Sequence, residues 1–163
     1  MDTTIFVPLS AVFGLVLFGL AVRWYYWPWA RRVSLKEAAT PILLLHMIRY
    51  EGLGFLVPGV VSPLLDPTFA HSAAYGDLTA ACLALLALVA LRFESAAARP
   101  LLWIFALEGF VDLLTAVGLG IKHAQGGLLQ TMYFIPTIGV PLLLVTHVAL
   151  FFLLLRKRGA TQA

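Results

Sequence analysis

The chain has 163 residues, of which 61% are hydrophobic and only 12% are charged. Soluble domains carry about 25% charged residues, so this composition excludes an ordinary soluble protein and predicts a single integral membrane domain. The formal net charge is +3, but the chain has no basic run interleaved with aromatic residues, so no nucleic-acid site is indicated. The single cysteine, Cys82, excludes an internal disulfide.

The first apolar run covers residues 5–22. Its start is acidic, with Asp2, whereas a secretory signal peptide starts with basic residues. The aromatic and basic stretch 23–32 follows the run, which is typical of an anchor at the membrane interface. We therefore expect a retained transmembrane helix and no cleaved signal.

Four further apolar runs have about the length, roughly 20 residues, that a helix needs to cross a bilayer. Ser34 and Glu37 have the spacing of a capping box ahead of the second run. Asp77 lies at the start of the third run, where we expect it to cap the first helical turn. These four predicted spans cover residues 40–61, 74–91, 101–121 and 132–155, and a basic tail, 156–163, ends the chain.

The fold class predicted is therefore an all-α integral membrane bundle with five transmembrane helices, and its basic residues orient it. With five spans, three basic groups fall on one side, and the opposite side holds only Lys122. The positive-inside rule then places the N-terminus outside and the C-terminus in the cytoplasm. Abundant alanine, absent asparagine and the preference for arginine favour a bacterial inner membrane. The three groups are Arg23, Arg31, Arg32 and Lys36; Arg92 and Arg99; and Arg156, Lys157 and Arg158.

Titratable side chains from three different spans are predicted to share one layer of the membrane. At a rise of about 1.5 Å per residue, Arg49, Glu108 and His147 each lie roughly 12 Å from the cytoplasmic edge. His46 shares a helix face with Arg49, and Asp112, roughly 18 Å deep, shares one with Glu108. An isolated ion in lipid costs roughly 2.5–3.5 kcal/mol. We therefore expect these faces to turn inward, with Arg49 paired to Glu108 and Asp112 close by.

The carboxyl groups in these spans outnumber the cations. Glu51, Glu108 and Asp112 accompany a single guanidinium, which leaves two surplus negative charges while both histidines are neutral. A buried surplus of this kind favours a bound proton or cation. Glycine and proline also interrupt the second and fifth runs near these charges, a pattern that points to transporter sites.

We therefore expect the chain to bind or transport a small solute or cation, coupled to protons. No resident metal or cofactor is predicted, and no motif identifies a family. The partners expected are the lipid bilayer, the solute or proton, and a second copy or a larger membrane complex. The candidate binding residues are Arg49, Glu51, Glu108, Asp112, His147 and His46.

Three alternatives stay open at this stage. The charges could simply fix helix packing in an accessory subunit of a larger complex. The carboxylates and a histidine could act as acid and base in a membrane-embedded enzyme, although the absence of a nucleophile or metal motif disfavours enzymatic activity. His46 and His147, on different helices, could ligate a b-type haem.

Overall fold

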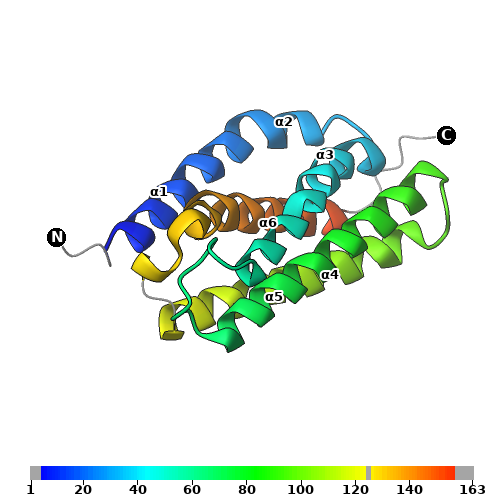
Figure 1. Ribbon diagram of the computed structural model, residues 1–163. Helices are drawn as coiled ribbons and strands as arrows, with labels where there is room; N and C mark the ends of the chain where they lie inside the picture. The colour runs from blue at the N-terminus through cyan, green and yellow to red at the C-terminus, as the bar shows by residue number, and fades with distance from the viewer. Residues whose placement is uncertain (1–4, 124–125, 157–163) are drawn as a thin grey trace, which may run out of the picture.

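The computed structural model describes residues 5–123 and 126–156, and within these ranges the chain is helical without strands. The helices run side by side in an elongated bundle (Figure 1). Four helices in the described ranges are long and apolar enough to cross a membrane, which agrees with the predicted class of helical membrane protein. These four are Phe6–Ala30, Pro67–Arg92, Ala98–His123 and Gln130–Leu155.

The first helix is longer than predicted. α1 (Phe6–Ala21) continues through a π-helical turn, η2 (Val22–Tyr26), into α2 (Trp27–Ala30). The Tyr26 hydroxyl donates a 2.6 Å hydrogen bond to the carbonyl of Ala38 and so ties the end of this helix to the next one. The aromatic stretch predicted as an interface anchor therefore extends the helix instead of following it.

The second predicted span, 40–61, has two kinds of helix. The predicted capping box is present, since Ser34 Oγ accepts from the Glu37 N–H and Glu37 accepts from the Ser34 N–H. It starts α3 (Leu35–Met47), after which the chain tightens into the 3-10 helix η3 (Ile48–Leu56). The glycines of η3, which destabilise an α-helix, fit this change of winding.

The third predicted span, 74–91, begins too late. α4 covers Pro67–Arg92, and its N-cap is Asp66, whose carboxylate accepts from the N–H groups of Thr68 and Phe69 at 2.8 and 3.2 Å. The capping role predicted for Asp77 is therefore wrong, because Asp77 is buried well inside the helix. An aspartate followed by a proline at the first helical position is a strong start signal, and here it lies ahead of the strongly apolar stretch.

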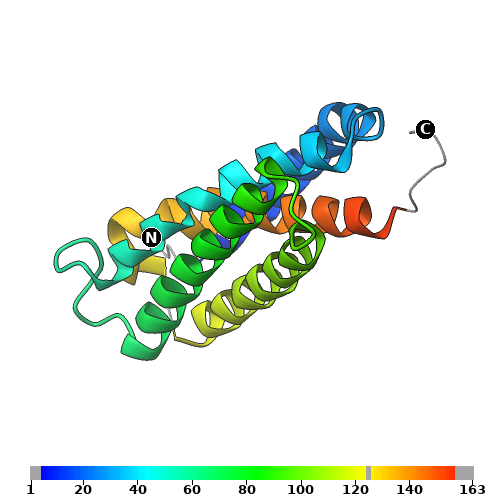
Figure 2. The same cartoon turned by 90° about the vertical axis from the view of Figure 1, so that its right-hand side faces the viewer.

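The last two helices complete the bundle. α5 (Ala98–His123) runs antiparallel beside α4, as two views of the ribbon show (Figures 1 and 2). The final span begins with short 3-10 segments, η4 (Gly126–Leu128) and η5 (Gln130–Tyr133), and a π-helical turn, η6 (Ile135–Gly139), before α6 (Val140–Leu155). Its early prolines, Pro136 and Pro141, coincide with this irregular winding.

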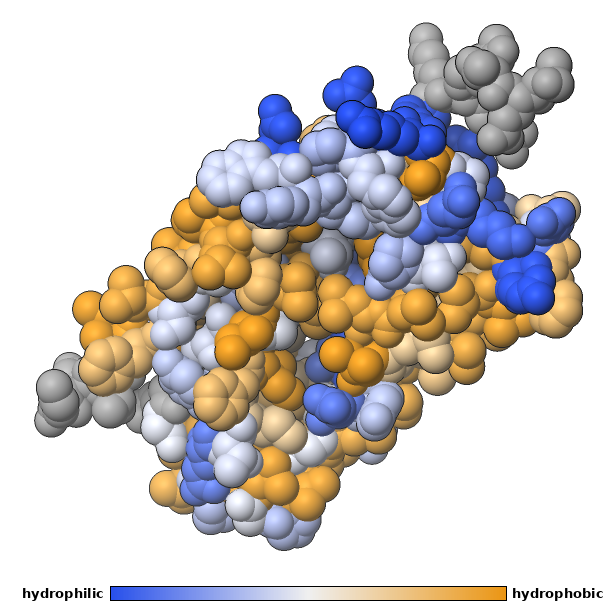
Figure 3. All heavy atoms as spheres, turned by 90° about the horizontal axis from the view of Figure 1, so that it is seen from above, coloured by the Kyte–Doolittle hydropathy of each residue, from blue (hydrophilic) through white to orange (hydrophobic). Residues whose placement is uncertain are grey.

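Small residues bring the central helices close together. The buried face of α4 consists largely of alanines, among them the fully buried Ala74, Ala80, Ala84 and Ala87. Small side chains at an interface let helix backbones approach each other, as in many membrane bundles. Large apolar side chains cover the outside instead, and in Figure 3 they form much of the flank. An apolar exterior of this extent is typical of a surface in contact with lipid.

The described basic groups gather at one end of the bundle. Arg156, after α6, donates to the carbonyl of Ala30, and Arg99 of α5 donates to the carbonyl of Leu154. Lys36 of α3 forms a 3.1 Å ion pair with Glu94 in the turn between α4 and α5. The most hydrophilic residues accordingly lie mainly at the top and upper right of Figure 3, with fewer in its lower part. The predicted grouping is confirmed for these residues, whereas Lys157 and Arg158 lie outside the described ones.

We predict that Gly14 is required for the contact between α1 and α6. A Cβ at Gly14 would meet the Thr137 carbonyl oxygen at 3.0 Å and Pro141 at 3.1 Å, whereas one at Gly19 of the same helix meets nothing within 4 Å. Gly14→Leu should therefore lower the thermal unfolding temperature in detergent, and Gly19→Leu should leave it unchanged or raise it. Equal unfolding temperatures for the two variants would contradict this packing.

Candidate functional site

The Arg49 side chain forms the centre of the candidate site. It projects from η3, and only 1% of the side chain is exposed. Its Nε donates a 2.7 Å hydrogen bond to Asp77 Oδ1 of α4, and its Nη2 donates to Asp112 Oδ2 of α5. The third nitrogen, Nη1, donates to the carbonyl oxygen of Gly109 at 3.4 Å. One guanidinium therefore connects three helical segments.

The predicted ion pair between Arg49 and Glu108 is wrong, because the structure pairs Arg49 with Asp77 and Asp112. Asp112 had been expected close by, but Asp77 had been assigned to the helix end. Glu108 lies on the same helix as Asp112, one turn away, and its Oε2 is buried without a hydrogen-bond partner among the described residues. The extra carboxyl is thus present beside the ion pairs but does not take part in them.

Three glycines make room for the charged side chains. A Cβ on Gly52 of η3 would overlap the Asp77 carboxylate, and one on Gly76 of α4 would overlap that of Asp112. A Cβ on Gly109 of α5 would lie 2.8 Å from His147 Nε2 and 3.0 Å from Arg49 Nη1. Because each glycine lies on a different segment of the three that Arg49 connects, all three backbones approach the cluster closely.

The two histidines lie together against this cluster. The rings of His46 and His147 are buried in an edge-to-face contact, with their centroids 4.3 Å apart. His46 Nε2 lies 3.0 Å from the Thr146 hydroxyl, and that hydroxyl donates to the carbonyl of Leu142. His46 Nε2 is therefore the donor in the bond to Thr146. Both ring nitrogens of His147, and Nδ1 of His46, have no hydrogen-bond partner among the described residues.

The geometry of these rings does not fit the haem alternative. A haem iron bound by two histidines lies between them, with the plane of the macrocycle separating the rings. Here the rings of His46 and His147 contact each other directly, so no space is left for a macrocycle between them. Among the described residues, no group of three or more histidine, cysteine or acidic side chains is arranged to hold a metal ion.

Five of the six predicted residues come together. Arg49, Asp112 and the two histidines are joined by the contacts above, and Glu108 borders them from α5. These five side chains therefore lie together, whereas their shared depth in a membrane stays a prediction. Glu51 is exposed and takes part in neither ion pair, as its position on the helix indicated. The residue that sequence reasoning missed is Asp77, and the start signal at Asp66 and Pro67 could have revealed its position inside a helix.

The predicted surplus of carboxyl groups is present, but Asp77 takes the place of Glu51. We define the Arg49 cluster as Arg49, Asp77, Glu108 and Asp112. It contains three carboxyl groups and one guanidinium; Arg49 and Asp77 are buried, and Asp112 and Glu108 are partly buried. When all three carboxyls are ionised, the cluster carries two surplus negative charges, and a low-dielectric environment makes such a surplus costly. A proton or another cation at this site would relieve it.

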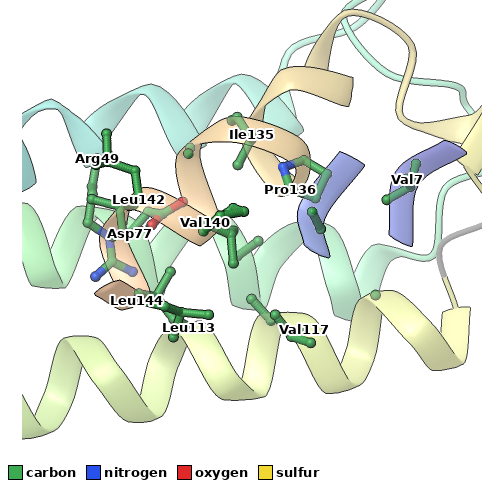
Figure 4. A pocket seen from close by; sticks show the side chains of 18 of the residues that line it. Val7, Arg49, Asp77, Leu113, Val117, Ile135, Pro136, Val140, Leu142 and Leu144 are labelled. Carbon is green, nitrogen blue, oxygen red and sulfur yellow. Dashed lines mark hydrogen bonds and ion pairs between the residues drawn. The ribbon is translucent and has the colours of Figure 1, made fainter. Parts of the chain in front are cut away.

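A cavity of about 780 Å³ extends from this cluster toward the end of the bundle opposite the basic groups. It lies between α1, α5, η6 and α6, and Figure 4 shows Arg49 and Asp77 together at one end of it. Its volume is within the range of roughly 300–1,000 Å³ typical of ligand sites. Most lining residues are apolar, including Val7, Leu15, Leu113, Val117, Ile135 and Val140.

Comparison with known proteins places the chain in a family. A family model described as a domain of unknown function, DUF8737, matches residues 6–155. The chain belongs to this family. No curated protein and no solved structure matches it. The matched range of DUF8737 includes the whole Arg49 cluster, both histidines and the cavity.

We predict opposite roles for two carboxyls of the cluster. Asp77→Asn removes one charge-assisted hydrogen bond to a buried guanidinium, which should cost on the order of 1.5–3 kcal/mol of the free energy of unfolding. Glu108→Gln removes a surplus charge that has no ion pair, so stability should stay the same or rise. Unfolding of both variants in detergent measures the difference. A larger loss for Glu108→Gln would instead support the original Arg49–Glu108 pairing.

Proposed function

We propose that this protein binds a small solute within a membrane helix bundle and couples its binding or transport to protons through the Arg49 cluster. The observation that supports this most directly is the meeting of three carboxyl groups around one guanidinium at the end of a large apolar cavity. Charged residues inside a membrane segment are costly and are found mainly where they have a function.

The surplus of carboxyl groups is the reason we expect solute binding to be coupled to proton binding. Arg49 neutralises one of the three carboxyl groups, and the remaining two favour a proton or another cation in a site with little water. Glu108, whose buried Oε2 has no hydrogen-bond partner in the described residues, is free to hold a proton without breaking an ion pair. A solute that changes the charge at this site would therefore change the number of protons it binds.

A structural role is the second candidate, and one observation favours it. Every nitrogen of the Arg49 guanidinium has an acceptor, so the side chain connects η3, α4 and α5 whether or not a solute binds. In that case the cluster would fix helix packing, for instance in a subunit of a larger complex. The surplus carboxyl Glu108 favours the first candidate, because a purely structural ion pair does not require it.

We also propose that α3 and η3 cross the membrane together as a fifth span. The 13 residues of α3 and the nine of η3 extend roughly 37 Å, because a 3-10 helix rises about 2 Å per residue. The hydrocarbon core is about 30 Å thick. The basic end would then lie in the cytoplasm, the N-terminus outside and the cavity in the outer half of the membrane. A bacterial inner membrane fits this arrangement.

Proton movement tests the proposed coupling. Liposomes that contain the purified protein and the internal pH dye pyranine are given an inside-negative potential with valinomycin and a potassium gradient. We expect wild-type protein to admit protons faster than protein-free liposomes. Asp112→Asn should reduce the rate to that of protein-free liposomes, because it removes a titratable group of the cluster.

Glu94→Gln is the matched control for this experiment. It removes a carboxyl whose side chain is 81% exposed in the turn between α4 and α5, where it pairs with Lys36 and with no member of the Arg49 cluster. This variant should conduct protons like the wild type. Equal proton flux in the wild type and Asp112→Asn would exclude the proposed mechanism, and wild-type flux no faster than that of protein-free liposomes would favour the structural role.

The orientation is tested by labelling single cysteines in intact cells. In a Cys82→Ala background, Leu64→Cys places a thiol at an 80% exposed position at the end that we assign to the outside. Ala97→Cys places one in the exposed turn between α4 and α5, at the basic end. A membrane-impermeant maleimide should label Leu64→Cys and leave Ala97→Cys unlabelled until the cells are opened. The reverse pattern would mean that the protein is inserted in the opposite orientation.

A further inference from the structure

We propose that the cavity binds a lipophilic organic cation, a molecule with an apolar body and one positive centre. This inference rests on the proposed function and names the chemical class of its solute. The inference combines two properties of the cavity: its walls are largely apolar, and the ionisable residues that line it are two acids and one arginine.

The walls determine the body of the ligand. Side chains from α1, η3, α4, α5 and the η6–α6 segment surround the space, and Figure 4 shows Val7, Leu113 and Val117 among them. A volume of about 780 Å³ is large enough for a molecule of several rings or a branched hydrocarbon. A small hydrophilic ion or sugar would lose its hydration there without regaining hydrogen bonds, so the walls select against it.

The mouth of the cavity determines the route of entry. Val12 of α1 and Ile121 of α5 both line the cavity, and they are 59% and 84% exposed. Both residues lie within candidate membrane spans, so lipid would cover the surface around them. A ligand that enters beside them passes along a lipid-covered surface, and such a ligand must itself dissolve in lipid.

The charged end determines the sign of the ligand. Arg49, Asp77 and Glu51 are the ionisable residues that line the cavity. Arg49 is already neutralised by its bonds to Asp77 and Asp112, so the guanidinium is not available to attract an anion. The exposed carboxyl of Glu51 and the surplus charge of the cluster attract a cation instead. A positive centre at this end would offset the same surplus that otherwise favours a bound proton.

Two probes of the same shape and opposite charge test this inference. Tetraphenylphosphonium is a lipophilic cation, and tetraphenylborate is the anion of nearly equal size. Binding to the purified protein in detergent is measured by equilibrium dialysis. We expect saturable binding of tetraphenylphosphonium and binding of tetraphenylborate that is roughly tenfold weaker or less, which corresponds to about 1.4 kcal/mol.

Two pairs of variants locate the binding site. Val117→Trp fills the cavity from α5 and should abolish tetraphenylphosphonium binding, whereas Val111→Trp, at a 60% exposed position on the same helix, should leave it unchanged. Glu51→Gln removes an exposed carboxyl that lines the cavity and should weaken binding several-fold, whereas Glu94→Gln should have no effect. Thermal unfolding of each variant confirms that it is folded.

Several results would overturn the inference. These are equal binding of the two probes, no saturable binding of tetraphenylphosphonium, or unchanged binding to the folded Val117→Trp variant. None of these results bears on the proton-flux experiment, because that experiment uses neither probe and tests Asp112. Proton flux that depends on Asp112 without cation binding would therefore retain the proposed coupling and reject only this class of solute.

Discussion

The burial of one guanidinium is the constraint on which the centre of this bundle depends. Arg49 cannot be neutralised by losing a proton, so its charge must be met by acceptors within the protein. The structure provides them from two other helices, Asp77 and Asp112. Those carboxylates in turn need space next to helix backbones, which Gly52 and Gly76 supply by having no side chain. The contacts of Arg49 and the small residues around them thus help to hold η3, α4 and α5 together.

The cluster contains more carboxyl groups than this structural task requires. Two aspartates already offset the charge of the guanidinium, yet Glu108 lies beside them with a buried oxygen that has no hydrogen-bond partner among the described residues. His147 is buried nearby, likewise without a described partner. Buried polar groups are usually hydrogen-bonded, because each unmade bond costs roughly 1–3 kcal/mol. Their accumulation beside the ion pairs of Arg49 is easier to explain by an exchangeable proton or ligand than by packing alone.

Much of this arrangement could be predicted from sequence, and the errors share one cause. Hydrophobic runs and basic groups identify the helices and the end where Arg99 and Arg156 lie, because these signals are spread over many residues. To predict the partner of Arg49, one must know how far along its helix each carboxyl lies. That position depends on where the helix begins. Placing the start of α4 at residue 74 instead of Pro67 moved Asp77 from the buried core to a helix end. The switch from α3 to η3 was also missed, since hydropathy does not distinguish 3-10 from α-helical winding.

The cavity and the Arg49 cluster share two residues, Arg49 and Asp77. A ligand in the cavity can therefore contact the cluster directly. Asp77 both accepts a hydrogen bond from Arg49 and lines the cavity. A positive centre that approached its carboxylate would compete with the guanidinium for the same oxygens, and Arg49 would then interact more strongly with Asp112 or Glu108. Occupancy of the cavity would thereby alter which carboxyl of the cluster can hold a proton. Coupling between solute and proton would then require only a change of partner at one arginine, without a large movement of helices.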